Sequence, residues 1–162
     1  MTIQVGDKLP SVTLRQITPE GPKEITTDDF FRGRKVTLFA VPGAFTPACT
    51  QRHLPGYVDK AADIKAKGID EVACVAVNDA AVMGAWGKQQ HTEGKVTMLA
   101  DGSGDFARAL GLELDASRMG LGIRSKRYSM LVDNCVVKSL NVEPQPGQVD
   151  VSSAETMLRA LG

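Results

Sequence analysis

The sequence predicts an α/β fold in a single domain spanning residues 1–162, and three observations support this prediction. Short apolar runs rich in β-branched residues alternate with stretches that carry helix start and stop signals, which is typical of a sheet with helices on both faces. The length of 162 residues suits one hydrophobic core. The hydrophobic share of 43% and the charged share of 23% are ordinary for a globular chain and argue against disorder.

Strands are expected where a short apolar run lies between turn residues. Residues 35–41 (KVTLFAV) are the clearest case, and this run ends abruptly at Pro42. The other segments of this kind are residues 12–14, 23–25, 71–77, 96–99, 128–133 and 136–140. The first two flank a turn-rich stretch and predict an opening hairpin, whereas the last two flank Asn134 and predict a closing hairpin.

Helices are expected from their capping and stop signals. Residues 50–67 predict a helix that Gly68 stops, with a kink or break at Pro55. Three more helices are expected, namely residues 80–90 after an Asn78-Asp79 cap, a short helix ending near Gly111, and a last helix after the capping-box-like Ser152-Ser153-Ala154-Glu155. The resulting order is thioredoxin-like, with an N-terminal hairpin extension and a central mixed sheet flanked by helices.

The charge balance excludes several classes of partner. The 19 Lys+Arg offset the 19 Asp+Glu, so no global field attracts nucleic acid or an anionic membrane. No apolar run approaches the roughly 18 to 20 residues of a membrane span. The first residues lack the basic start and apolar stretch of a secretory signal, so we expect a cytoplasmic protein.

The cysteines Cys49, Cys74 and Cys135 are odd in number, widely spaced and without a CxxC pair. This pattern fits neither a disulfide framework nor a cysteine-rich zinc site. Cys49 differs from the other two, because it follows a loop rather than lying in or beside a strand-like run.

The loop after residues 35–41 carries the strongest candidate for chemistry, since ligands gather at the carboxyl ends of strands in open α/β sheets. Pro42 and Pro47 stiffen this loop, and Gly43 lets the backbone approach a ligand closely. Cys49 falls in or just before the first turn of the next helix, where unpaired N–H groups and the helix dipole stabilise a thiolate. The alternative for Cys49 is a small buried hydrophobic residue.

The pattern Pro42-x-x-x-Thr46-x-x-Cys49 resembles the active-site signature of peroxiredoxins, and VPGAFTPACTQRHLPGYV is similar to the type II (peroxiredoxin-5-like) subfamily. Six further motifs fall in the order and spacing of that subfamily, namely VND at 77–79, AWG at 85–87, LADG at 99–102, GLG at 120–122, RYSM at 127–130 and NVEP at 141–144. The resemblance runs from about Val5 to the last helix.

This resemblance implies a thiol-dependent peroxidase that reduces hydrogen peroxide and alkyl hydroperoxides in antioxidant defence and redox homeostasis. Cys49 would be the peroxidatic cysteine and would pass through a sulfenic acid. Thr46 would hydrogen-bond the thiolate or the peroxide, and Arg127 would keep Cys49 ionised and polarise the peroxide. Without the resemblance, Arg127 reads as part of a solvated basic cluster at residues 124–127 or of a phosphate-binding patch.

Other members of the loop receive roles from the same resemblance. Pro42 would shield the site from bulk water, and Gly43 and Phe45 would contact the substrate. No metal, haem or flavin cofactor is required, because the sulfur itself changes oxidation state. A homodimer packed near the active sites is also implied.

The reducing half of the cycle depends on the other cysteines. Some subfamily members carry a resolving cysteine after the last strand, but residues 143–153 contain none. Cys74, 25 residues after Cys49, resembles the second cysteine of plant-type members, yet its run EVACVAV favours a packed small hydrophobic residue. Cys135, beside the Asn134 turn, reads as an incidental thiol. We therefore expect a one-cysteine enzyme recycled by glutathione and glutaredoxin or by thioredoxin.

His53 lies four residues after Cys49, on the same helical face. A Cys/His metal pair and a Cys–His hydrolase dyad are alternatives, but two ligands do not close a zinc site and no orienting third group is evident. A surface position or a supporting role beside the site is favoured. Two other functions compete with a peroxidase: a thiol–disulfide oxidoreductase, which the missing CxxC argues against, and a non-catalytic redox-sensing module.

Overall fold

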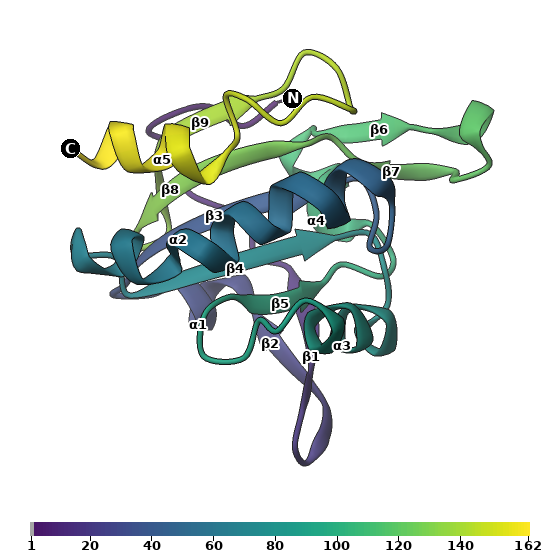
Figure 1. Cartoon of the computed structure of the whole chain (residues 1–162), viewed down its shortest axis with the longest axis horizontal. Helices are drawn as coiled ribbons and strands as arrows, with labels where there is room; N and C mark the ends of the chain where they lie inside the picture. Colours follow the sequence, from purple (N-terminus) through teal and green to yellow (C-terminus); the bar gives the residue numbers. More distant parts are fainter. Residues whose placement is uncertain (1) are drawn as a thin grey trace.

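The computed structural model describes residues 2–162 and shows a seven-stranded mixed sheet with helices packed on it (Figure 1). The strand order in the sheet is β2-β1-β5-β4-β3-β8-β9, and β6 and β7 form a separate two-stranded sheet. The strands are β1 (Thr13–Thr18), β2 (Gly21–Thr26), β3 (Lys35–Val41), β4 (Glu71–Ala76), β5 (Thr97–Ala100), β6 (Glu113–Asp115), β7 (Ile123–Ser125), β8 (Tyr128–Asp133) and β9 (Val136–Val142). The helices are α1 (Thr27–Phe31), η1 (Cys49–His53), α2 (Leu54–Ala66), α3 (Ala80–Gln89), α4 (Asp105–Leu110), η2 (Ser117–Met119) and α5 (Ala154–Leu161).

The middle of the sheet is parallel and its two sides are antiparallel. Strands β3, β4 and β5 pair in parallel, as the alternation of strands and helices predicts. The predicted opening hairpin is β1–β2, and the predicted closing hairpin is β8–β9. Both hairpins join the sheet through antiparallel pairs, β1 with β5 and β8 with β3.

The alternation of side chains along β3 divides the core into two layers. Leu38 and Ala40 pack in the cluster that includes residues of α1 and α4. Phe39 and Val41 pack in the other cluster, which includes Cys49 and residues of α2, α3 and α5. Because successive strand residues point to opposite faces, a run that is apolar at nearly every position must be covered on both sides.

The helix after β3 differs from the expectation in one respect. No break occurs at Pro55 itself, because α2 runs without interruption from Leu54. Pro55 has no N–H to bond the preceding turn, and the helix is irregular in that turn. The irregularity lies just before Pro55: η1 is a π-helix in which the Leu54 N–H donates to the Cys49 carbonyl. Such π-helical turns are frequent at functional sites.

The cap of the last helix also differs by one residue. Ser153, rather than Ser152, is the N-cap of α5, and its side chain accepts a hydrogen bond from the Thr156 N–H. Ser152 is fully buried and bonds elsewhere. Neither α1 nor the β6–β7 hairpin was expected from the sequence.

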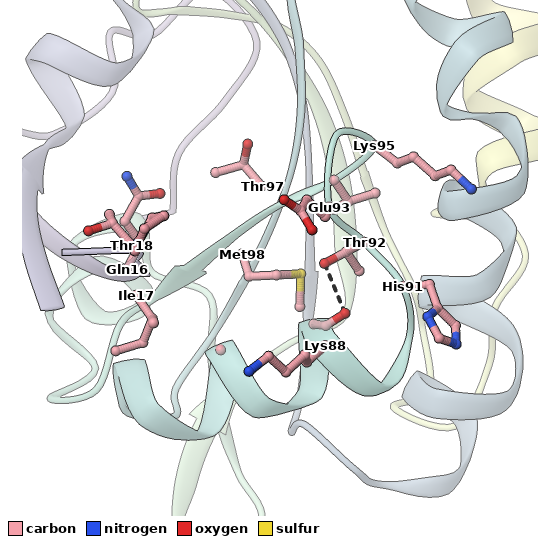
Figure 2. A pocket seen from close by; sticks show the side chains of 14 residues that line it. Gln16, Ile17, Thr18, Lys88, His91, Thr92, Glu93, Lys95, Thr97 and Met98 are labelled. Atoms are coloured by element: carbon pink, nitrogen blue, oxygen red, sulfur yellow. Dashed lines mark hydrogen bonds between the residues drawn. The ribbon is translucent and has the colours of Figure 1, made fainter. Parts of the chain in front are cut away.

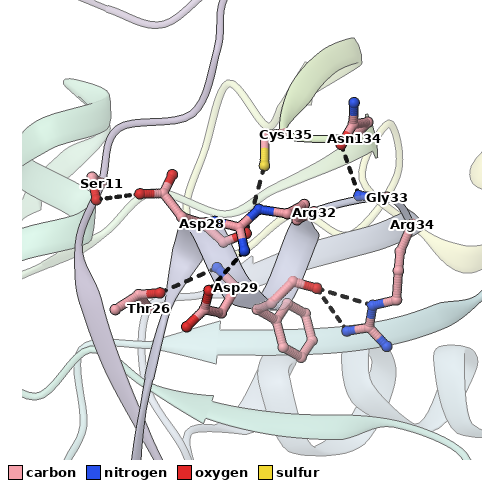
Figure 3. A network of polar contacts seen from close by, with 10 residues as sticks. Ser11, Thr26, Asp28, Asp29, Arg32, Gly33, Arg34, Asn134 and Cys135 are labelled. Carbon is pink, nitrogen blue, oxygen red and sulfur yellow. Dashed lines mark hydrogen bonds and ion pairs between the residues drawn. The ribbon is translucent and has the colours of Figure 1, made fainter.

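The β8–β9 turn is fixed by a polar network (Figure 3). Asn134 and Cys135 both have positive φ values, 47° and 70°. The Asn134 Oδ1 accepts a bond from the Gly33 N–H at 2.7 Å, and the Cys135 Sγ lies 3.8 Å from the Asp28 carbonyl oxygen. Two consecutive left-handed residues are the geometry of a tight two-residue hairpin turn.

Among the helices of residues 2–162, none combines the length and apolar character that crossing a membrane requires.

Candidate active site

Cys49 lies where the chain leaves the β3 loop and enters a helix. The Thr50 N–H donates to the Thr46 carbonyl at 2.9 Å, which closes the first helical turn, and Cys49 lies inside this turn. The early N–H groups of a helix have no partner within it and stabilise negative charge. The Cys49 side chain is fully buried in this position.

Arg127 approaches the sulfur from the residue just before β8. Its Nη2 donates to the Cys49 Sγ at 3.1 Å, its Nε donates to the Pro146 carbonyl at 2.9 Å, and its Nη1 lies 2.9 Å from the His53 Nδ1. Arg127 is only 2% exposed, so it is not part of a solvated basic cluster. A charged donor in a buried setting stabilises an anionic acceptor strongly, so this contact favours the thiolate form of the cysteine.

His53 completes the environment of the guanidinium. Because arginine has no acceptor, the His53 Nδ1 must accept the bond from Arg127, and the His53 Nε2–H then donates to the Ser152 carbonyl at 3.0 Å. Burial, together with the neighbouring Arg127 charge, lowers the pKa of His53 to about 3. His53 is therefore a neutral ring whose tautomer is fixed by two bonds. The sequence predicted either a surface position or a supporting position beside the site for His53. In the structure His53 is buried and has the supporting position.

An aromatic wall lies beside these polar groups. The rings of Phe39 and Tyr57 stack with centroids 3.9 Å apart, and the Phe39 ring lies 4.9 Å from the His53 ring. The Tyr57 hydroxyl donates to the Ser152 carbonyl at 2.8 Å, and burial raises the pKa of this hydroxyl. The wall excludes water, which strengthens the Arg127–Cys49 attraction.

The β9–α5 loop, residues 143–153, closes the site through its backbone. Its Pro146 carbonyl binds Arg127, and its Ser152 carbonyl binds His53 and Tyr57. The sequence indicated only that this loop lacks a cysteine, and the part of its carbonyls in the site was missed because backbone carbonyls leave no pattern in the sequence.

Thr46 and Gly43 lie in the loop as expected, and the Thr46 hydroxyl bonds within this loop. The Thr46 Oγ1 donates to the Gly43 carbonyl at 2.6 Å, so its lone pairs remain free to accept a bond from a peroxide O–H. A Cβ on Gly43 would lie 3.1 Å from the Thr46 Cγ2, so a side chain there would press on Thr46. Pro42 is buried beside them.

Phe45 is partly exposed, unlike the buried Pro42, Gly43 and Cys49. It has a positive φ of 64° and is 49% exposed, and its ring centroid lies 6.4 Å from that of Trp86. The Trp86 Nε1 in turn donates to the Thr50 Oγ1 at 3.1 Å, beside Cys49. Phe45 is thus at the outer rim of the site rather than in its buried part.

Asn78 and Arg124, which had no predicted part in the site, make hydrogen bonds beside the loop. The Asn78 Oδ1 accepts a bond from the Ala44 N–H at 2.9 Å. Arg124, from the predicted basic cluster, donates to the carbonyls of Val77 at 3.0 Å and Leu121 at 2.8 Å. The Asn78 bond links the carboxyl end of β4 to the loop after β3, and the Arg124 bond to Val77 links the same end of β4 to β7.

Cys74 lies on β4, in the same core layer as Cys49. Burial raises its pKa well above the usual range, with the neighbouring Cys49 adding to the effect and Arg127 opposing it. All three cysteines are free and buried. A fully buried thiol held in its neutral form is inert, which fits the interpretation of Cys74 as a packed side chain.

A surface hollow of about 730 Å³ lies elsewhere, between β1, α3 and β5 (Figure 2). Ile17, Lys88 and Met98 line it, and Gly84 and Gly87 let α3 pack closely there. It contains none of the residues bound to Cys49.

Within residues 2–162, no group of three or more His, Cys, Asp or Glu side chains is arranged to hold a metal ion.

A thioredoxin-like sheet with a buried cysteine at a helix start, bonded to a buried arginine, defines a cysteine-based redox protein. The family model described as Redoxin matches residues 4–158. The chain is 52% identical over 165 residues to "Peroxiredoxin-2E-2, chloroplastic" of Oryza sativa subsp. japonica, covering 99% of this chain and 73% of the relative. It is 47% identical to "Peroxiredoxin-2D" of Arabidopsis thaliana, covering 98% of both.

A solved structure of reduced Prx3 in complex with H2O2 from Vibrio vulnificus has a TM-score of 0.95 at 52% identity, covering 99% of this chain and 100% of that one. The chain therefore belongs to the Redoxin family, among the type II peroxiredoxins, and is a thiol-dependent peroxidase.

Proposed function

We propose that Cys49 is the peroxidatic residue and that the enzyme follows a one-cysteine cycle. The Cys49 thiolate attacks the terminal oxygen of a hydroperoxide, so that an S–O bond forms as the O–O bond breaks. The leaving oxygen takes up a proton and departs as water or an alcohol, and the sulfur, oxidised by two electrons, is left as a sulfenic acid. The observation that supports this proposal is the 3.1 Å bond between the buried Arg127 and the Cys49 sulfur.

The surrounding residues take complementary parts in this step. Arg127 stabilises the thiolate and the charge that develops on the leaving oxygen. The Thr46 hydroxyl already donates its proton to the Gly43 carbonyl, so its oxygen is left to accept a hydrogen bond from the peroxide O–H. This bond aligns the O–O axis with the sulfur. Pro42 and Gly43 form the buried side of the loop, and Phe45 meets the substrate at the rim.

We also propose that an external thiol completes the cycle. A thiol condenses with the sulfenic acid to give a mixed disulfide and water, and a second thiol then releases Cys49 by exchange. Glutathione with glutaredoxin, or thioredoxin, are the candidate reductants. The absence of cysteine from residues 143–153 and the inert setting of Cys74 support this route.

The three free thiols also support a reducing compartment, the cytoplasm, which fractionation with an antibody to the chain would test.

For the assembly, we propose a homodimer that covers the rim of the site. Large apolar side chains are exposed at Phe45 (49%), Met119 (61%) and Ile123 (49%), the last two at the β6–β7 hairpin. Arg124, through its bonds to Val77 and Leu121, links that hairpin to the site. Large apolar side chains that are exposed to water favour association.

Steady-state H2O2 consumption with each candidate reductant tests the cycle. The double variant Cys74→Ser/Cys135→Ser should retain the turnover of the unmodified enzyme with at least one of them. The one-cysteine route is wrong if the double variant stops turning over and mass spectrometry finds a Cys49–Cys74 disulfide in the oxidised unmodified enzyme.

A further inference from the structure

A buried carboxylate next to the active site has no part in the chemistry described so far. Glu143, just after β9, is only 6% exposed. Its Oε2 accepts three hydrogen bonds, from the Asp150 N–H at 2.7 Å, the Ser152 N–H at 2.8 Å and the Ser152 Oγ at 2.6 Å. Its Oε1 is buried without a hydrogen-bond partner among residues 2–162. Burying a carboxylate costs free energy, so these three bonds indicate that the carboxylate has a structural role, which is to hold Asp150 and Ser152 in place.

What Glu143 holds is the β9–α5 loop. Its three bonds tie the end of the loop, at Asp150 and Ser152, back to the beginning. The Glu143 N–H also donates to the Arg127 carbonyl at 2.9 Å, so the same residue is anchored to the backbone of the active-site arginine. The loop is therefore closed on itself by one side chain.

The closed loop supplies the fixed partners of the Arg127 guanidinium. The Pro146 carbonyl accepts the Arg127 Nε–H directly. The Ser152 carbonyl fixes the tautomer of His53, whose Nδ1 accepts the Arg127 Nη1–H. With Nε and Nη1 both held, the planar guanidinium has one orientation, and in that orientation Nη2 lies against the sulfur.

We propose that Glu143 is a positioning residue of the peroxidase: its carboxylate closes the β9–α5 loop and so aims Arg127 at Cys49. This inference rests on the proposed role of Cys49. Loss of the Glu143 acceptor leaves the buried N–H and hydroxyl of Ser152 without their partner and releases the Asp150 N–H. The loop then loosens, and the guanidinium loses both fixed partners. Misplacement of a catalytic group by about 1 Å costs on the order of 10²-fold in rate.

The variants Glu143→Ala and Glu143→Gln separate positioning from burial. The alanine variant removes the acceptor, whereas the glutamine amide oxygen can accept the same three bonds without the charge. Asp101→Ala is the matched control. Asp101 is also a buried carboxylate, 4% exposed, and its oxygens accept the Phe106 N–H at 3.0 Å and the Ala107 N–H at 2.9 Å, but these bonds hold α4 on the other core layer.

The experiment measures the second-order rate constant for Cys49 oxidation by H2O2, trapped with dimedone and quantified by mass spectrometry, along with Tm and the pH profile of Cys49 alkylation by iodoacetamide. We expect Glu143→Ala to lower the rate constant about 10- to 100-fold and to move its alkylation profile to higher pH. Glu143→Gln should stay within about threefold of the unmodified enzyme, and Asp101→Ala should keep its rate and profile despite a lower Tm.

The proposal is overturned if Glu143→Ala reacts with H2O2 at the rate of the unmodified enzyme. It is also overturned if the rate constant of Glu143→Gln falls as far as that of Glu143→Ala. The third contrary outcome is an equal fall in the rate constant of Asp101→Ala when the two alanine variants have the same Tm. If the alanine variant does not fold, Glu143→Asp replaces it, because a shorter carboxylate withdraws from the same N–H groups, and the same comparison applies. A failure of the proposed function itself is distinguishable, since the unmodified enzyme would then form no dimedone adduct at Cys49.

Discussion

The Arg127 guanidinium lies 3.1 Å from the Cys49 sulfur, although the two residues are 78 positions apart in the sequence. The two residues come together because their strands are neighbours in the sheet. Cys49 follows the end of β3, and Arg127 precedes the start of β8, which pairs with β3 in the antiparallel direction. Both side chains are buried, so their attraction is not screened by water. The antiparallel pairing of two neighbouring strands therefore brings together the two residues of the proposed reactive centre.

The variant Cys49→Ser should abolish peroxide consumption, because a serine hydroxyl is neither ionised nor nucleophilic towards an O–O bond near neutral pH. Cys135→Ser provides the matched control, since Cys135 lies at the β8–β9 turn beside Asp28, in the other core layer, and should retain full activity. Loss of H2O2 in a ferrous-oxidation assay measures both. Turnover that persists in Cys49→Ser would contradict the assignment.

Arg127→Lys should lower the rate constant for peroxide by about 10²-fold or more. A lysine ammonium keeps the charge, but it lacks the planar fork that bonds Cys49, His53 and Pro146 together. The control is Lys126→Ala, which removes an exposed neighbouring charge and should leave the rate constant unchanged. Stopped-flow oxidation of the reduced enzymes compares them, and equal rates for Arg127→Lys and the unmodified enzyme would show that charge alone suffices.

His53 should make the free energy of unfolding depend on pH. Its pKa is about 3 when folded against 6.5 when unfolded, so between these values the unfolded chain binds a proton that the folded chain does not. Stability therefore falls as pH decreases from 6.5 towards 3, by up to about 1.4 kcal/mol per pH unit from this group, and the group has no effect above that window.

His53→Gln keeps a donor and an acceptor but cannot titrate. Urea unfolding of this variant and the unmodified enzyme at pH 7, 6, 5 and 4 should give curves that diverge as the pH falls, with the variant losing less stability. Parallel curves would show that His53 is protonated in the folded enzyme or already neutral in the unfolded one.

Phe45→Glu should weaken the proposed homodimer, because it replaces an exposed apolar side chain at the rim of the site by a charged one. Val5→Glu is the control, since Val5 is equally apolar and 61% exposed but precedes β1. Sedimentation velocity at several protein concentrations should give a smaller sedimentation coefficient for Phe45→Glu only. Identical coefficients in both variants would place any interface elsewhere.

Sequence alone was sufficient for the features that depend on local pattern. The β-branched run at Lys35–Val41, the Asp79 cap of α3 and the turn at Asn134 each depend on neighbouring residues, and each is present. The position of Cys49 in the first helical turn after β3 follows from the same local signals.

The support of the site could not be predicted in this way, because it depends on residues far apart in the chain. His53 lies 74 positions from Arg127 and 99 from Ser152, so little near it in the sequence distinguishes it from the exposed His91. The one available signal was its spacing of four residues from Cys49. The proposed part of Glu143 could not be predicted for a different reason, since it depends on backbone groups of its own loop, and such groups leave no pattern in the sequence.

The bond from Trp86 to Thr50 has a practical consequence. The chain contains a single tryptophan, and its buried indole donates to the residue adjacent to Cys49. Indole emission depends on the polarity and hydrogen bonding around the ring, so oxidation that shifts the Cys49 turn should change the fluorescence of one defined chromophore. The enzyme thus carries an intrinsic optical reporter through which each step of its redox cycle could be followed in real time, without a label.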